Sequence, residues 1–357
     1  MKKYRMPRLN RRSFLAGTGA VAAGLTLPRF GHAAEEPVVN FYNWDTYIGE
    51  TTLDDFQDAT GIEVKMDLFA DNDELFAKLK EGNPGYDLIV PTNDFTERMI
   101  LAGMLQPLDH GMIPNFANVS EAFQDAEFDP KRKYSMPYMW GTMGIGYRKS
   151  RVDGVPDSWE WVFDSDKYAG RIAWLSESGT MMGIALKYLG YSLNATDPAE
   201  IAAAEALLIK QKPNLKVIAE DNGQDLLLSG EVDLAIEWNG DILQVQEEDD
   251  DLAYVVPKEG SLVWQDTLAI PTGAPHPENA HKLINYLLDA EAGAAIADFI
   301  QYATPNQAAR ELMDAAYREN PSIFPSDQTL AKCEAQIYAG EDRQRLINDA
   351  WTRIQAA

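Results

Sequence analysis

The sequence predicts an α/β fold divided between two lobes, and three observations support this prediction. The chain has 357 residues, enough for two domains at roughly 150 residues each. Hydrophobic residues make up 45% of it and charged residues 24%, a balance typical of a chain that buries a sizeable core. Short apolar strand patterns alternate with helical patterns in two separate series, as βαβ units do.

The first series predicts three strand–helix pairs. They are a strand at 38–42, a helix at 51–60, a strand at 62–66, a helix at 73–80, a strand at 86–91 and a helix at 96–102. In the first helix Leu53, Phe56 and Ala59 share one face, and Gly61 ends it. The continuous apolar run at 86–91 is typical of a parallel strand buried on both faces.

The second series predicts further strands and a mainly helical C-terminal region. The strands are 171–175, 216–219, 232–236, 254–257 and 268–271, and the helices are 181–189, 198–210, 278–289, 291–300, 310–318 and 341–355. Pro198 stands at the start of its helix, where the missing N–H costs nothing. The alternation again favours parallel strands with crossover helices.

The N-terminus carries the pattern of an export signal. Seven of the 31 basic residues and none of the 56 acidic ones lie in the first 33 positions. Arg11-Arg12 precedes Phe14-Leu15 and an apolar run at 16–27, which is too short to cross a hydrocarbon core of ~30 Å. Gly31 and Ala33 supply the small residues of a cleavage site. We expect residues 1–33 to be a twin-arginine signal peptide, recognised by the twin-arginine translocase and cleaved near Ala33, which delivers the protein to the periplasm.

The net charge and the cysteine content argue against a nucleic-acid-binding protein, a disulfide-stabilised monomer and a lipoprotein. The formal net charge is −25, and an acidic surface repels the phosphates of nucleic acids, so we expect no nucleic-acid partner. Cationic ligands are favoured instead. Cys333 is the single cysteine, so a monomer can form no internal disulfide, and no cysteine follows the signal peptide for lipidation.

Motifs of common enzymes are missing. After residue 33 the only histidines are His110, His276 and His281, and none belongs to an H-E-x-x-H zinc motif. The sequence has no G-x-S-x-G nucleophile elbow, phosphate-binding P-loop or dinucleotide-binding glycine motif. The sequence therefore predicts no catalytic residue, no metal and no cofactor.

Aromatic–acid pairs are the chemistry that the sequence does offer. Trp44 is directly followed by Asp45. Asp241 comes three residues after Trp238, and Asp266 comes two residues after Trp264. The first two pairs lie just past the carboxyl end of an apolar strand, where open α/β sheets bind ligands. An aromatic ring attracts a cation through its quadrupole, and a carboxylate adds a charge-assisted hydrogen bond. These pairs therefore favour an organic ammonium as ligand.

Several segments resemble the bacterial periplasmic polyamine-binding proteins. The similar segments are 41–44, 86–92, 136–142, 238–240, 257–260, 264–271 and 302–306, and the resemblance extends over essentially all of residues 38–357. It implies a two-lobed type II periplasmic solute-binding fold with the ligand cleft between the lobes. It also implies a protein that delivers spermidine or putrescine to the membrane permease subunits of an ABC importer.

The resemblance also implies how the chain is divided. The expected parts are lobe 1 at 34–143, lobe 2 at 144–264, a return to lobe 1 at 265–305, and C-terminal helices at 306–357, mainly in lobe 2. We expect the protein to act as a monomer that closes around its ligand.

The family's binding residues carry over position by position. The aromatic box falls on Trp44, Tyr47, Trp238, Trp264 and Tyr302, the amine-binding acid on Asp266, and polar neighbours on Thr92 and Gln336. Asp45 follows the first tryptophan, and Asp241 matches an acid of putrescine-type members. A glutamate of the family aligns near Thr180, and Glu177 is the expected replacement carboxylate.

Two rival functions remain open on sequence alone. The first is binding of another cationic amine, such as a monoamine or a guanidinium compound, by Asp266 and one aromatic cage. The second is an exported enzyme that acts on amines or glycans, which the missing catalytic motifs disfavour.

Overall fold

The computed structural model describes residues 35–357, so the predicted signal peptide lies outside the described residues. The strands are β1 (Val38–Asn43), β2 (Glu63–Leu68), β3 (Leu88–Ile89), β4 (Ser135–Arg148), β5 (Ile172–Leu175), β6 (Val217–Ala219), β7 (Leu234–Trp238), β8 (Leu252–Val255), β9 (Leu262–Ala269) and β10 (Glu334–Ala335). The helices are α1 (Thr52–Thr60), α2 (Asn72–Lys80), α3 (Asn93–Leu101), α4 (Glu160–Phe163), α5 (Ser178–Tyr188), α6 (Pro198–Gln211), α7 (Gly223–Leu228), α8 (Asn239–Glu248), α9 (Pro277–Leu287), α10 (Ala290–Ile300), α11 (Gln307–Leu312), α12 (Ala315–Arg318), α13 (Asp327–Leu330) and α14 (Glu341–Ala356).

The first half of the fold contains the predicted parallel strands. β1 lies between β2 and β3 and is parallel to both, so the carboxyl ends of these strands share one edge. Local signals set the helices between them. Gly61 ends α1 in the left-handed conformation at φ 74°, and the Asp71 side chain accepts a hydrogen bond from the Glu74 N–H at the start of α2.

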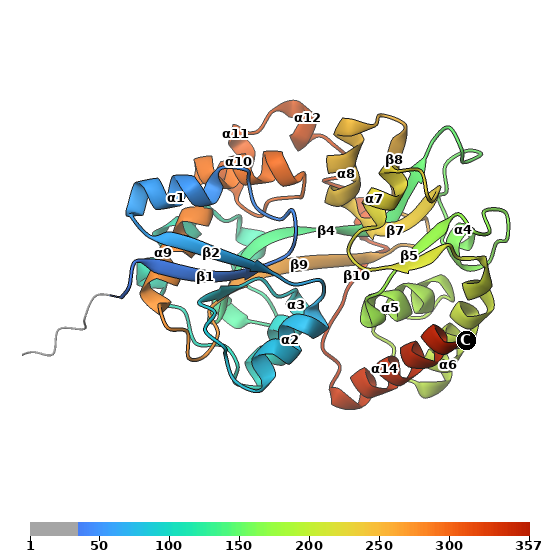
Figure 1. The fold of residues 1–357 in the computed structure, drawn as a ribbon, viewed down its shortest axis with the longest axis horizontal. Helices are drawn as coiled ribbons and strands as arrows, with labels where there is room; N and C mark the ends of the chain where they lie inside the picture. Colours follow the sequence, from blue (N-terminus) through green and yellow to red (C-terminus); the bar gives the residue numbers. More distant parts are fainter. Residues whose placement is uncertain (1–34) are drawn as a thin grey trace, which may run out of the picture. The chain divides into compact units, whose positions relative to one another are not determined.

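Two long strands connect the two halves (Figure 1). β4 has 14 residues and pairs antiparallel with β9 from Ser135 to Thr142. From Met143 onward the same strand pairs antiparallel with β7 and β8 of the second half. β9 also pairs with β3, so the strand order is β2-β1-β3-β9-β4-β7-β5-β6.

The second half repeats the parallel arrangement. β5 lies between β7 and β6 and is parallel to both, so the carboxyl ends of these three strands also share one edge. Helices α5, α6 and α14 pack against one another beside this part of the sheet (Figure 1). The C-terminal helix α14 therefore contributes to the second half, although it is far from β5 in sequence.

Separate apolar cores stabilise the two halves. One large cluster centres on Phe41, Leu88 and Ile284, and another on Trp159 and Trp174. Trp238 packs against both clusters, at the place where β7 meets the first half. The C-terminal region divides between the two cores. Apolar residues between Tyr302 and Ile323 belong to the first core, and those of α14 belong to the second.

The α/β class predicted from the sequence is confirmed, with differences in some elements. The strand predicted at 268–271 is the end of β9, which begins at Leu262. The helix predicted at 310–318 is two short helices, because Asp314 caps α12 through the Tyr317 N–H and interrupts the run. Among residues 35–357, no helix is both long and apolar enough to span a membrane. Cys333 is a free thiol.

Candidate functional site

A slot of about 370 Å³ lies where the two halves meet. Five aromatic residues, four aspartates and one threonine line it: Trp44, Tyr47, Trp238, Trp264, Tyr302, Asp45, Asp221, Asp241, Asp266 and Thr92. The loops after β1 and β3, strand β9 and a residue after α10 provide one wall. Residues after β6, at the end of β7 and in α8 provide the other. The slot therefore occupies the carboxyl ends of parallel strands, the usual place for a ligand in an α/β fold.

The aromatic rings form a connected wall. Trp264 meets Tyr302 edge to face with ring centroids 5.1 Å apart, and Trp238 meets Trp264 in the same way at 5.8 Å. Tyr47 meets Tyr302 at 5.3 Å and an interplanar angle of 82°. The Trp44 indole donates a hydrogen bond to the Val90 carbonyl at 2.9 Å, which fixes that ring beside the slot. Such a wall suits an aliphatic chain that carries positive charge.

Two glycines make room for this wall. A Cβ at Gly141 would lie 2.6 Å from the Trp264 ring, and a Cβ at Gly240 would lie 2.6 Å from the Tyr302 ring. Any larger residue at either position would displace an aromatic ring of the slot. The absence of side chains on β4 and α8 at these points therefore shapes the binding surface.

Asp266 is the buried acid of the first wall. It is 6% exposed, and its Oδ1 atom has no hydrogen-bond partner among the described residues. Burial raises the pKa of Asp266 to about 7, although the Thr92 and Tyr47 hydroxyls partly oppose this shift. An ionised carboxylate here needs a cation to compensate for the water that it has lost.

Three further carboxyl groups gather at the opposite wall. One oxygen each from Asp221, Glu237 and Asp241 lies within 4.8 Å of the others. Burial raises the pKa of all three groups, and mutual repulsion raises those of Asp221 and Glu237 further. Sequence reasoning identified Asp241 but missed the other two. Glu237 was detectable as a charged residue inside a strand that is otherwise apolar.

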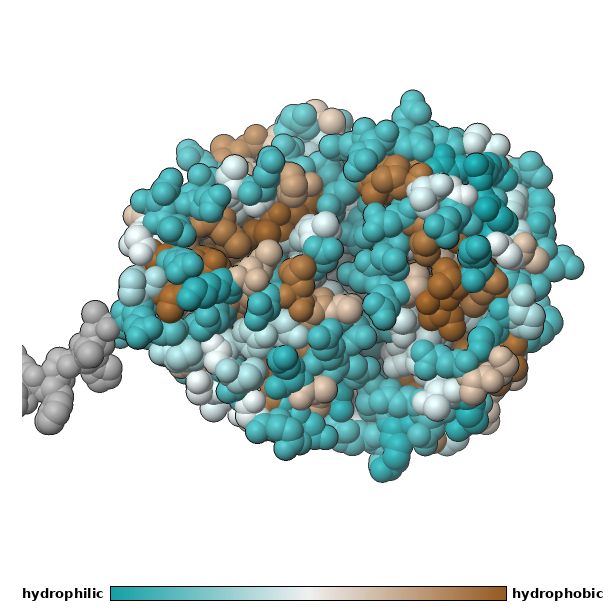
Figure 2. Space-filling view, in the orientation of Figure 1, coloured by the Kyte–Doolittle hydropathy of each residue, from teal (hydrophilic) through white to brown (hydrophobic). Residues whose placement is uncertain are grey.

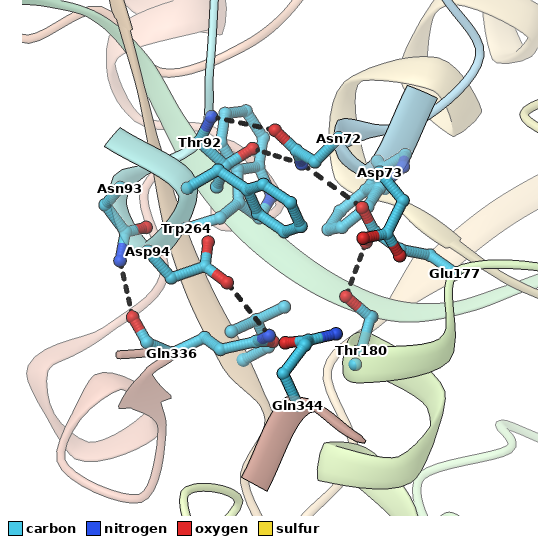
Figure 3. Close-up of a pocket in the computed structure, with 14 residues that line it drawn as sticks. Asn72, Asp73, Thr92, Asn93, Asp94, Glu177, Thr180, Trp264, Gln336 and Gln344 are labelled. Carbon is cyan, nitrogen blue, oxygen red and sulfur yellow. Dashed lines mark hydrogen bonds between the residues drawn. The ribbon is translucent and has the colours of Figure 1, made fainter. Parts of the chain in front are cut away.

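Figure 3 shows a second pocket of about 420 Å³. It adjoins the slot and shares Thr92, Trp238 and Trp264 with it. Glu177 stands at the N-terminus of α5 and reaches across to the first half. Its Oε1 accepts a hydrogen bond from the Asn72 amide at 3.2 Å, and its Oε2 accepts one from the Thr180 hydroxyl at 2.5 Å. Burial raises the pKa of Glu177 to about 8.

Asp94 supplies the other carboxylate of the second pocket. It lies in the first turn of α3, is 9% exposed, and accepts a hydrogen bond from the Gln336 amide at 3.1 Å (Figure 3). The Asn93 side-chain amide donates a hydrogen bond to the backbone carbonyl of Gln336, so both the backbone and the side chain of Gln336 are bonded to α3. Burial raises the pKa of Asp94 to about 6, and the nearby Arg343 only partly opposes this. Sequence reasoning missed Asp94.

All twelve residues predicted from the sequence lie in these two pockets. The slot contains nine of them: Trp44, Asp45, Tyr47, Thr92, Trp238, Asp241, Trp264, Asp266 and Tyr302. The second pocket contains Glu177, Thr180 and Gln336. Asp45 is exposed, and its Oδ1 accepts a hydrogen bond from the Thr46 N–H at 2.9 Å, so it lies at the rim.

Five acids of the two pockets are buried or half-buried, and none of the five forms an ion pair with a basic residue in the part of the chain that the structure describes. No lysine or arginine of residues 35–357 forms an ion pair with Asp94, Glu177, Asp221, Asp241 or Asp266. Structural carboxylates that are buried are usually paired or neutralised. This arrangement therefore favours a cationic ligand that supplies the missing charge.

An acidic groove lies beside the pockets. It is lined partly by Asp71, Asp73, Glu74, Glu177 and Glu220, and it contains about 1070 Å³ of space. Hydrophilic residues also dominate the face of the molecule seen in Figure 2. Acids at a groove of this kind raise the local concentration of cations and speed their entry.

Comparisons with known proteins agree with this arrangement. The profile of the bacterial extracellular solute-binding protein family matches residues 51–325. The spermidine/putrescine-binding periplasmic protein of Escherichia coli strain K12 is 36% identical over 328 residues, covering 91% of this chain and 93% of that protein. The putrescine-binding periplasmic protein PotF of the same strain is 33% identical over 360 residues, with coverage of 95% and 97%.

Solved structures show the same fold. A protein from Listeria monocytogenes has a TM-score of 0.86 and 33% identity, covering 90% of this chain and 99% of that chain. The substrate-binding protein PotD of a spermidine/putrescine ABC transporter from Streptococcus pneumoniae has a TM-score of 0.76 and 30% identity, with coverage of 89% and 98%. The two-lobed type II fold expected from the sequence is thereby confirmed, and the chain belongs to the family of bacterial extracellular solute-binding proteins.

Proposed function

We propose that this protein is the substrate-binding component of an ABC importer and that it binds a polyamine, putrescine or spermidine, in the slot. The observation that carries the proposal is a set of buried carboxylates without basic partners beside a wall of aromatic rings. Aliphatic polyamines have the matching chemistry, because ammonium groups alternate with methylene segments. The names of the relatives support the same ligand class.

Each part of the slot has a role in this proposal. Asp266 and Asp241 lie on opposite walls and bind separate ammonium groups. Trp264 and Tyr302 pack against the methylene chain between them, with Tyr47, Trp44 and Trp238 completing the aromatic surface. Thr92, Gln336, Glu177 and Thr180 extend the polar lining into the second pocket, and Asp45 attracts the ligand at the rim.

Ligand binding is coupled to closure of the two halves. The ligand touches both halves, so the closed state gains contacts that an open state lacks. We propose the division expected from the sequence, with lobe 1 at 34–143 and 265–305, lobe 2 at 144–264, and 306–357 mainly in lobe 2. β4 and β9 are the connections that would bend, and the change of pairing partner at Met143 supports this.

The proposed function requires export of the protein and contact with a membrane permease. We propose export by the twin-arginine translocase, cleavage near Ala33 and a monomer in the periplasm that docks on the permease subunits. Its relatives are periplasmic binding proteins, which supports that location. We propose that it catalyses no reaction and needs no cofactor.

A thermal-shift panel tests the ligand class. The amines are putrescine, cadaverine, spermidine, spermine, agmatine and a monoamine, with glucose and glutamate as non-cationic controls. A true ligand at about 100 times its Kd stabilises the protein by roughly 2.7 kcal/mol, an easily measured rise in Tm. A rise with polyamines alone supports the proposal. A rise with only the monoamine, agmatine, glucose or glutamate contradicts it.

A further inference from the structure

The cluster of Asp221, Glu237 and Asp241 has a geometry of its own. Asp221 follows β6, Glu237 lies in β7, and Asp241 lies in the first turn of α8. Because β6 and β7 are both parallel to β5, their carboxyl ends bring these residues to one edge of the sheet. One carboxylate oxygen from each lies within 4.8 Å of the other two, which leaves room for one small cationic group between them.

Glu237 is the unusual member of this cluster. Its side chain is 0% exposed, and its Oε1 atom has no hydrogen-bond partner among residues 35–357. Its Oε2 atom accepts a hydrogen bond from the Trp238 backbone N–H at 3.0 Å. A Cβ at Gly223 would lie 2.3 Å from Oε1, so a glycine there makes room for this carboxyl group. A buried and incompletely bonded acid requires a partner, and a strand position of this kind is ordinarily apolar.

The position of the cluster indicates what that partner is. Asp221 and Asp241 line the slot, and a carboxylate oxygen of Glu237 lies within 4.8 Å of one oxygen of each. The rings of Trp238, Trp264 and Tyr302 line the same slot, where they would contact a methylene chain attached to a cation. A primary ammonium has three N–H donors, one for each carboxyl group, whereas a secondary ammonium has two.

We propose that Asp221, Glu237 and Asp241 together bind one primary ammonium group of the ligand, and that Glu237 is a specificity-determining residue that favours –NH3⁺ over an N-alkylated ammonium. This inference rests on the proposed polyamine-binding function and adds two residues to it. An N-methyl group at this end removes one donor and places an apolar group among carboxylates. The loss of a hydrogen bond between charged groups changes affinity by about tenfold or more.

The test compares putrescine with N,N′-dimethylputrescine, in which both ends are secondary ammonium groups. Isothermal titration calorimetry on the wild type is expected to show a preference for putrescine of about tenfold or more. In Glu237→Gln, a change of nearly equal volume, the preference is expected to fall below about threefold because the third acceptor is weakened. Asp221→Asn is the second variant and is expected to reduce the preference in the same direction, should Glu237→Gln fold poorly.

Glu259→Gln is the matched control. Glu259 lies in the second half but outside the slot, where its carboxylate accepts hydrogen bonds from the Ser158 hydroxyl and the Trp159 N–H. It is expected to leave the preference at the wild-type value. A purely structural role for Glu237 would weaken both amines by the same factor, and this outcome overturns the inference. Unchanged affinities in both cluster variants overturn it as well.

Three further outcomes separate this inference from its alternatives. If Ca²⁺ stabilises the ligand-free wild type but not Glu237→Gln, while the preference between the amines is unaffected, the cluster is a metal site and the inference is wrong. If the wild type binds no amine at all, both the proposed function and this inference are wrong. If putrescine binds and depends on Asp266, but the cluster variants show no change in preference, only this inference fails.

Discussion

The Trp264 and Tyr302 rings meet edge to face, with centroids 5.1 Å apart and planes inclined by 77°. Trp264 comes from β9, and Tyr302 follows α10, so the contact brings together two segments that are distant in sequence. Both side chains are at least 96% buried and belong to the core of the first half, yet both also line the slot. The same two rings therefore stabilise the fold and present the binding surface.

Replacing Trp264 with alanine is expected to impair both properties. Loss of the ring removes cation–π and apolar contact with the amine, weakening its affinity by about 0.5–2 kcal/mol. The cavity left in the core lowers the free energy of unfolding by about 3–5 kcal/mol. Calorimetric titration and urea denaturation of the same preparation measure the two effects.

Trp174→Ala supplies the control for that measurement. Trp174 is fully buried in the second half, and its indole donates to the Val162 carbonyl away from the slot. We expect a comparable loss of stability with no change in the amine affinity of the folded protein. Equal losses of affinity in the two variants would show that Trp264 acts only through packing.

Asp266→Asn is expected to weaken amine binding severely. The carboxylate is buried, and the described chain offers it no basic partner, so the ligand ammonium is its counter-charge. Breaking a buried ion pair by neutralising one partner costs about 3 kcal/mol or more. Titration calorimetry with putrescine measures the loss. Asp298→Asn, on the exposed face of α10, should bind as the wild type does. A loss below about 0.5 kcal/mol in Asp266→Asn would remove this residue from the site.

The sequence pairs three tryptophans with nearby aspartates, and the structure brings these residues together in one slot. Trp44, Trp238 and Trp264 each precede an acid that lines the slot. The reason is local, because a ligand site at the end of a strand draws on consecutive residues of one loop. The alternating strand and helix patterns likewise predicted most elements of both halves to within a few residues.

The long crossing strand was missed because its composition is unusual for a strand. β4 contains Pro137 and the glycines Gly141, Gly144 and Gly146, residue types that are depleted in sheets. The glycines are explained by contacts made in three dimensions. A Cβ at Gly144 would lie 2.4 Å from the Val255 carbonyl oxygen, and one at Gly146 would lie 2.4 Å from the Ile242 side chain. Sequence periodicity contains no information about such crossings.

Asp94, Asp221 and Glu237 were missed for a related reason. None of them follows a tryptophan closely, so the local pattern did not mark them. The proximity of Asp221 and Glu237 to the ligand site depends on the order of the strands, which brings β6 beside β5 and β5 beside β7. Asp94 lies in the first turn of α3, and its place in the second pocket depends on its contact with Gln336, which is distant in sequence. Asp241 lies inside α8, which begins at Asn239 and shows no side-chain cap, so helix capping does not explain this acid.

The stability of the ligand-free protein should fall as the pH rises through neutrality. Burial raises the pKa of Asp266 from 3.8 to about 7, so the folded state holds this proton more tightly than the unfolded chain does. The resulting stabilisation is complete below about pH 4 and is lost as the pH rises towards about 7. Urea denaturation from pH 4.5 to 8 should therefore show that the free energy of unfolding of Asp266→Asn increases relative to that of the wild type as the pH rises. A constant difference across this range contradicts the shift.

Amine affinity should change with pH in the opposite direction. The ligand binds the ionised carboxylate, so protons held by Asp266 and Glu177 compete with it. Affinity is expected to rise between pH 5.5 and pH 8, with release of protons on binding. Calorimetry in two buffers of different ionisation enthalpy counts these protons. A pH-independent affinity without proton release would mean that the acids are already ionised before the amine binds.

Asp94→Asn should affect long amines more than short ones. Asp94 lies in the second pocket, which adjoins the slot at Thr92, Trp238 and Trp264, so only a longer ligand reaches it. We expect about a tenfold loss for spermidine and less than twofold for putrescine. Glu97→Gln, one turn further along α3, is the matched control because its carboxylate accepts from the Tyr338 N–H outside the pocket. Equal losses for both amines would mean that the second pocket does not bind the ligand.

Calorimetric titration of the purified protein with putrescine and spermidine at pH 7.5 tests the central claim most directly. The account predicts saturable binding of at least one of them with one molecule per chain, abolished or weakened by at least about a hundredfold in Asp266→Asn. Glucose and glutamate should produce no binding heat. Saturable binding of either of these two compounds, with no heat from any polyamine, would contradict the account.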